Sequence, residues 1–148
     1  MLVAPLKTRL EGRVQELQGR LFTASDFMAV MESNVVPAGG VNGYLIPAGV
    51  TGVPTRGTGA ISGFFTQEVR HGVSLVVLLR NVDRHGKRAL DELDTFSADI
   101  TAAVCGWAPD GVVGVFELQR AGVIETRHRG VLAYQFQFFI TDQLRITP

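Results

Sequence analysis

The side chains that could support covalent or metal chemistry in this sequence are few and scattered. There is a single cysteine, Cys105, which excludes both an intrachain disulfide and a zinc site built from several thiolates. The three histidines are His71, His85 and His128, and the pair Asp83 and His85 comes nearest to a metal-ligand spacing. We therefore predict no metal site, no cofactor and no catalytic residue.

Cys105 nevertheless leaves one catalytic alternative open. It could act as a nucleophile if His71 or His85 approached it in the folded chain, as in a small cysteine-dependent enzyme. Its place at the end of an apolar helical stripe, beside Gly106 and Trp107, favours a buried structural thiol instead.

Recognition motifs for nucleotides and nucleic acids are not found in the sequence. There is no G-x-x-x-x-G-K-[ST] phosphate loop and no G-x-G-x-x-G turn that opens a helix after a strand. The basic turn of Arg127, His128 and Arg129 is either solvated or a contact for a partner. Sequence-specific nucleic-acid binding would require more positive charge and exposed stacking aromatic residues.

The composition is neutral and somewhat apolar. The 148 residues carry 14 basic and 14 acidic side chains, and charged residues make up 19% of the chain, against roughly 25% in an average soluble domain. The start of the sequence lacks the apolar core of a signal peptide, and no apolar run approaches the ~20 residues that span a bilayer. We expect a protein made in the cytoplasm, either an apolar monomer or a subunit that hides surface in an oligomer.

The segment from Asp83 to Trp107 should position the rest of the chain. Its apolar residues recur at helical spacing, Asp83 is a candidate N-cap and Gly106 a candidate stop. The stripe consists of Leu90, Leu93, Phe96, Ile100 and Val104. We predict a long central helix that lies across a sheet, with Phe96 meeting Phe136 in the core.

The segments on both sides of this helix complete one α+β domain of residues 1–148. An N-terminal helix is predicted over Pro5 to Arg20, and a short helix over Ser25 to Ser33 with Ser25 and Asp26 at its start. Alternating apolar residues predict a mostly antiparallel sheet. Its strands are expected at Tyr44–Ile46, Ile61–Arg70, Val73–Arg80, Val113–Ile124 and Val131–Thr141, with a tight turn at His71 and Gly72.

A glycine- and proline-rich segment separates the short helix from the predicted hairpin. From Val36 to Ala60 it holds seven glycines and three prolines, which no helix tolerates. We expect a long loop over residues 48–59 that becomes ordered against another surface. The candidate subunit or partner contacts are Val50, Thr51, Val53 and Arg56 in this loop, together with Arg127, His128 and Arg129.

Four stretches of the chain resemble those of a known family in their order along the chain and in their general residue pattern. They read FMAVMESNVVPAGGVNGYLIPA, SLVVLLRN, ITAAVCGWAPDG and YQFQFFITDQL. With the N-terminal helix, they make the sequence similar to the tail terminator (tail completion) proteins of long-tailed bacteriophages. The resemblance covers nearly the whole chain.

The resemblance implies a structural protein of the virion, assembled in the host cytoplasm and located at the head-proximal end of the tail. Proteins of this family form hexameric rings that cap the tail tube, stop its polymerisation and present a surface to the head connector. The implied partners are other copies of this chain, the tail tube protein and the head-tail connector, with the genome passing through the ring without sequence-specific binding. Another neck protein of the same particle is the alternative.

Overall fold

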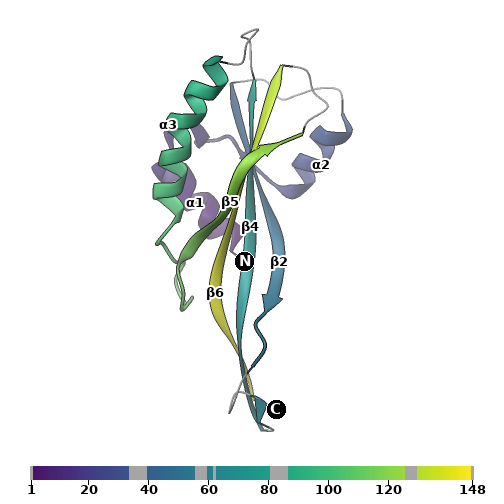
Figure 1. The fold of residues 1–148 in the computed structure, drawn as a ribbon, viewed down its shortest axis with the longest axis vertical. Helices are drawn as coiled ribbons and strands as arrows, with labels where there is room; N and C mark the ends of the chain where they lie inside the picture. Colours follow the sequence, from purple (N-terminus) through teal and green to yellow (C-terminus); the bar gives the residue numbers. More distant parts are fainter. Residues whose placement is uncertain are drawn as a thin grey trace.

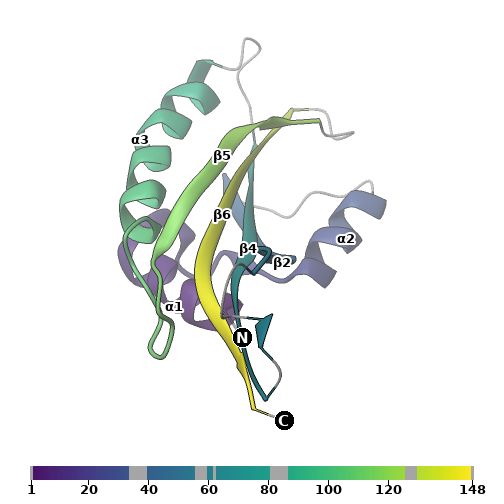
Figure 2. The same ribbon diagram turned by 60° about the horizontal axis from the view of Figure 1, so that its bottom comes forward.

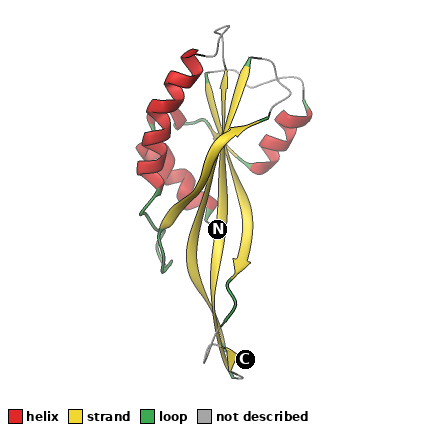
Figure 3. Ribbon diagram, viewed as in Figure 1, coloured by secondary structure: helices red, strands yellow, loops and turns green. Residues whose placement is uncertain are grey.

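The computed structural model describes residues 2–33, 40–55, 60–61, 63–80, 87–125 and 130–147, which form an α+β fold (Figures 1 and 3). The helices are α1 (Val3–Arg13), η1 (Gln15–Leu17, a 3-10 helix), α2 (Ala24–Glu32) and α3 (Lys87–Val104). The strands are β1 (Leu21–Phe22), β2 (Val41–Gly52), β3 (Ala60–Ile61), β4 (Phe64–Arg80), β5 (Phe116–Ile124) and β6 (Val131–Ile146).

The strands form one mixed sheet in the order β1-β2-β4-β6-β5, and β3 pairs with β4 beside this path. The β1–β2 pairing is parallel and the other pairings are antiparallel, so the predicted mostly antiparallel sheet is confirmed. Strand β4 lies between β2 and β6, and its residues 73–79 are buried on both faces. The apolar segment that begins at Val73 is therefore central, as its sequence predicts.

The predicted turn at His71 and Gly72 is wrong, because β4 passes straight through both residues. His71 pairs with Val50 on β2 and with Ile140 on β6, so neighbours on both sides extend the strand across this point. The short strand predicted at Tyr44–Ile46 is likewise part of the longer β2. The predicted loop over residues 48–59 is also corrected, since residues 48–52 belong to β2.

The sheet is strongly curved, with a bulge in each of two strands, β2 and β5. The register shifts between Pro47 and Gly49 on β2 and between Leu118 and Arg120 on β5. Such bulges bend and twist the strand that carries them. Figure 2 shows the result: the convex face lies under α1 and α3, and the concave face turns towards α2.

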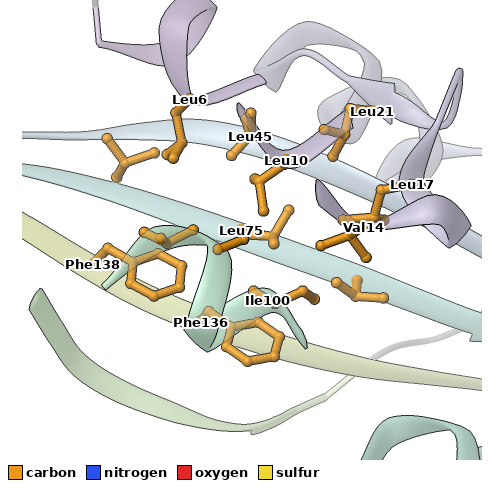
Figure 4. Packing of buried hydrophobic residues seen from close by; sticks show 14 of the residues in the cluster. Leu6, Leu10, Val14, Leu17, Leu21, Leu45, Leu75, Ile100, Phe136 and Phe138 are labelled. Carbon is orange, nitrogen blue, oxygen red and sulfur yellow. The ribbon is translucent and has the colours of Figure 1, made fainter. Parts of the chain in front are cut away.

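The main core lies between the convex face and the helices. Apolar residues spaced three or four apart in the N-terminal segment, from Leu6 to Leu21, are all buried, but the helix ends at Arg13 and not at Arg20 as predicted. Extended backbone at Val14 breaks the helix, and η1 and β1 carry the rest of the stripe. Figure 4 shows Leu6, Leu10, Val14, Leu17 and Leu21 directed at the sheet and at Ile100 of α3.

The single long central helix is not found. Helix α3 has 18 residues and shares the convex face with α1, because one helix cannot cover a sheet this wide. Its residues Leu93, Phe96, Ile100 and Val104 join the core, whereas the predicted cap at Asp83 lies outside the described residues. Gly106 follows the helix with a φ of 81°, a left-handed conformation that suits its predicted role as a stop.

Two strands near the end of the chain differ from their predicted lengths. Strand β5 begins at Phe116 and not at Val113, because the preceding residues form a loop that follows α3. Strand β6 continues past Thr141 to Ile146, since Phe65 to Val69 of β4 provide partners for the extra residues. Phe136 is fully buried and belongs to the same cluster as Phe96.

Helix α2 covers the upper part of the concave face. It begins after Thr23, and not at Ser25 as predicted, because Thr23 and Asp26 form a reciprocal capping box. Phe27, Val30 and Met31 form the apolar side of this helix and pack on the sheet in a second, smaller cluster.

Candidate functional site

The sheet extends beyond the helices as a narrow arm, which we define as residues 49–52 of β2, 64–71 of β4 and 140–146 of β6. Figure 1 shows this arm below the body of the molecule, with β6 ending near its tip. Strand β4 lies in the middle, where Thr51 pairs with Arg70 and Arg70 pairs with Thr141. The arm is therefore built by long-range strand pairing of three segments.

Exposed apolar side chains are concentrated on this arm and on the loop beside it. On the arm, Val50 is 61% exposed, Phe64 56%, Leu144 40% and Ile146 48%. In the loop, Val113 and Val115 are 75% and 45% exposed. These six side chains are two thirds of the nine large hydrophobic residues that are exposed in the described part of the chain. Such clustering on a soluble protein marks an interaction surface.

The loop is held against the arm by the backbone. The Gly114 N–H donates a hydrogen bond to the Thr141 carbonyl oxygen at 3.0 Å. A side chain at position 114 would collide with that same carbonyl, so the close approach requires glycine. Val113 and Val115 are therefore placed beside β6 by a fixed contact.

The two faces of the arm differ in chemistry. Strand register places Phe65, Val69, Leu144 and Ile146 on the face that continues from the helix-covered core, and Gln67, His71 and Asp142 share that face. The opposite face is mixed, because strand alternation places the exposed Phe64 there among polar side chains. There the Arg70 guanidinium lies 5.1 Å from the centre of the Phe139 ring, and Arg145 Nε donates to Gln143 Oε1 at 2.7 Å. The exposed Leu144 and Ile146 therefore lie on one face of the arm, and the exposed Phe64 lies on the other with Arg70 and Arg145.

Three of the predicted contact residues lie together at this arm. Val50 and Thr51 are exposed on β2, and Val53 is the first residue after the end of this strand. The Val53 N–H donates to the Glu68 carbonyl oxygen at 2.9 Å, and its own carbonyl accepts from Gln67 Nε2 at 3.1 Å. The other four, Arg56, Arg127, His128 and Arg129, lie outside the described residues.

The sequence analysis missed the rest of the apolar arm. Leu144 and Ile146 continue the alternation of β6 past its predicted end at Thr141, which was the available signal. Phe64 and Val113 lie in segments that the sequence predicts to be strands, and a strand pattern does not say which of its apolar side chains stay exposed to solvent.

The concave face also carries an open groove of about 430 Å³ between the arm and the body. Its polar lining includes Arg70, Ser74, Gln119 and Gln137, and Ser74 is buried to all but 5%. Gln119 occupies the β5 bulge, and Ser74 Oγ accepts a long hydrogen bond of 3.5 Å from Gln135 Nε2. Amides and hydroxyls suit hydrogen bonding, whereas acid–base chemistry would need titratable groups with tuned pKa values.

The structure gives the cysteine alternative no support. Cys105 is partly buried against the main core, and burial raises the pKa of its thiol above the ordinary value. A reactive cysteine needs the opposite, a lowered pKa that favours the thiolate. His71 lies in β4, and His85 is outside the described residues.

In the described part of the chain, no group of three or more His, Cys, Asp or Glu side chains has the arrangement of a metal site. None of the described helices has the length and apolar character needed to cross a bilayer.

Comparison with known proteins identifies the family. No curated protein matches the chain. The family model described as "Phage tail terminator protein" matches residues 1–148, which is the whole chain. Membership of that family carries a structural role in the phage tail. The resemblance noted from the sequence is confirmed, and the chain belongs to the phage tail terminator family.

Proposed function

We propose that this chain forms a ring, with six subunits as in the family resemblance, that caps the head-proximal end of the tail tube. The observation that carries the proposal is the arm, on which exposed Val50, Phe64, Leu144 and Ile146 gather. A free subunit would hold this apolar surface in water, so a partner surface is needed to cover it. No bond chemistry is required for such a role.

Subunit contacts in the ring use the exposed apolar side chains of the arm and the residues beside them. Two distinct surfaces that meet head to tail generate a closed ring when the rotation per subunit allows it. Val50, Thr51 and Val53, the contacts predicted from the sequence, are joined by Leu144 and Ile146 in this role. We extend the same proposal to Arg56 and to the turn of Arg127, His128 and Arg129.

The ring has two ends with different partners. One end binds the tail tube protein and stops polymerisation, because the other end does not accept a further tube ring. That other end binds the head-tail connector, and the genome passes through the lumen. The neutral chain, with 14 basic and 14 acidic residues, is compatible with DNA that slides without being gripped. The subunit is a single domain of residues 1–148, made in the host cytoplasm and incorporated into the virion tail.

The test compares two double substitutions in the full-length chain. The first, Leu144→Ser with Ile146→Ser, removes apolar surface from the arm. The matched control, Met28→Ser with Val123→Ser, removes exposed apolar side chains from α2 and β5, away from the arm. Each variant is examined by circular dichroism, native mass spectrometry and negative-stain imaging.

We expect both variants to keep the wild-type melting temperature, because exposed substitutions usually change stability by less than about 0.5 kcal/mol. The arm variant should lose the ring, and tails assembled with it should have uncontrolled length or fail to join heads. The control should form rings and tails of normal length. If the arm variant forms normal rings and tails, the role assigned to the arm is wrong. If the wild-type chain neither forms rings nor caps tubes, the proposed function itself is wrong.

A further inference from the structure

The hydroxyl of Tyr44 is buried and has no hydrogen-bond partner among the residues that the structure describes. Tyr44 is 1% exposed, and its ring lies between Phe22 and Phe27, with ring centres 5.5 and 5.6 Å away. Burial raises the pKa of this phenol, and the nearby charge of Asp26 raises it further. A buried hydroxyl that loses its bond to water and gains none in return destabilises the state that buries it.

The element that covers this hydroxyl is α2, together with Phe22 just before it. In the concave-face cluster, five described residues are buried: Val30 of α2, and Tyr44, Val76, Leu78 and Ala133 of the sheet. Phe27 and Met31 are partly exposed, and Met28 is 57% exposed. The cluster on the other face has 19 buried residues. A small apolar cluster lowers the free energy needed for a local opening.

Helix α2 is able to move as a unit because its first turn is closed by its own residues. The Thr23 N–H and Oγ both donate to Asp26 Oδ2 at 2.9 Å, and the Asp26 N–H donates to Thr23 Oγ at 3.3 Å. The hydrogen bond from the Thr23 backbone, followed by that from its side chain, holds the pKa of Asp26 below the ordinary value. None of these bonds reaches the sheet, so they survive when the helix leaves it.

We propose that α2 is a lid, which opens from the concave face while the rest of the sheet stays folded. Opening hydrates the Tyr44 hydroxyl and uncovers the apolar side chains of Val76, Leu78 and Ala133 beneath it. Closing buries these side chains again, but it also removes the Tyr44 hydroxyl from water and leaves it without a hydrogen bond. Figure 2 shows α2 on the opposite side of the sheet from α1 and α3, so opening of α2 need not disturb the main core. This inference is independent of the ring.

The experiment is hydrogen exchange of the full-length chain, measured by mass spectrometry at increasing low concentrations of urea. Amides of α2 should exchange faster than those in residues 73–79 of β4, with a weaker dependence on urea. Tyr44→Phe removes the unpaired hydroxyl and should slow α2 exchange by about fivefold or more. Tyr134→Phe is the matched control, since it removes the chain's other tyrosine hydroxyl, which lies on the opposite face.

The proposal is overturned if α2 and β4 exchange at the same rate with the same urea dependence, because α2 would then open only by global unfolding. It is also overturned if Tyr44→Phe leaves α2 exchange unchanged or speeds it, or if Tyr134→Phe slows it equally. Slower α2 exchange in Tyr44→Phe alone, on a background of faster α2 exchange in the wild type, supports the lid.

Discussion

The sheet carries an apolar cluster on each face, and the two clusters differ in size and in polarity. On the convex face, 19 buried residues of the described part of the chain form a continuous core, and they come from the segment of α1 and η1, from α3 and from the strands. On the concave face, the cluster has five buried residues among those described, namely Val30 of α2 and four residues of the sheet beneath it, and buried polar side chains lie on the same face. Asn42 and Tyr44 of β2 and Ser74 of β4 point to this second face, where all three are nearly inaccessible to solvent.

The two clusters therefore contribute differently to the folding stability of the subunit and to its contacts with partners. A large cluster without polar groups maximises the apolar area removed from water, which is the main favourable contribution to folding. A small cluster with buried hydroxyl and amide groups stabilises less, and it leaves the rest of the face open. We infer that the convex face holds the subunit together, whereas the concave face and the arm are available to partners.

The largest expected effect is in the convex core. Phe96 is 2% exposed, and truncation to alanine should cost roughly 3–5 kcal/mol of unfolding free energy, enough to unfold many domains of this size. Urea denaturation followed by circular dichroism measures the loss. A cooperatively folded Phe96→Ala protein with an unchanged midpoint would show that the convex cluster is not the main core.

A smaller effect is expected at Arg9, which ties α1 to the end of α3. Its Nε donates to the Ala103 carbonyl oxygen at 2.9 Å, and its guanidinium lies 5.4 Å from the Trp107 ring centre. Arg9→Ala should cost about 2 kcal/mol, because a helix-terminal carbonyl loses its donor and the ring loses its cation.

Arg9→Lys is the matched control, since it keeps the charge but not the planar group. It should recover part of the stability, because stacking and a directed hydrogen bond both depend on the guanidinium plane. Equal melting temperatures for wild type and Arg9→Ala would mean that α1 is held by its leucines alone.

Val30 tests the other side of the comparison. It is the buried residue that α2 contributes to the concave cluster, and Val30→Ala should cost about 1.5 kcal/mol by loss of apolar area. In hydrogen exchange the loss should appear in α2 before it appears in β4. If Val30→Ala lost as much unfolding free energy as Phe96→Ala, the distinction between a main core and a minor cluster would be wrong.

The smallest effect is predicted for Cys105. Its side chain is partly buried at the rim of the convex cluster, and Cys105→Ala should cost about 1 kcal/mol because little volume is lost. Ring formation and tail assembly should be unchanged. If the variant keeps its melting temperature but particle yield collapses, the thiol has a function that packing does not explain.

The candidate site was only partly predictable from the sequence. The glycine-rich segment pointed to Val50, Thr51 and Val53, because apolar residues with few charges are unusual in a solvated loop. Leu144 and Ile146 could not be added, since their exposure depends on where the helices stop covering the sheet. Val113 reaches the arm through the contact between Gly114 and Thr141, which are far apart in the chain.

The sequence by itself determined the elements whose apolar pattern is local and strong. The stripe from Leu93 to Val104 predicted α3, and the alternation from Leu132 to Ile140 predicted β6 with the correct face towards the core. These patterns follow from the fixed geometry of helices and strands, which repeat every 3.6 and every two residues. The tail terminator resemblance came from the same order of elements.

Tertiary structure decided what happens at residues whose local preference is weak. His71 and Gly72 read as a turn, yet they continue β4 because Val50 on one side and Ile140 on the other supply hydrogen-bonding partners. Val14 fits a helical stripe, yet the helix ends there and the chain turns into η1. The physical reason is the same in both cases: a residue with no strong preference of its own takes the conformation that satisfies its distant neighbours, and a single sequence does not state which neighbours those are.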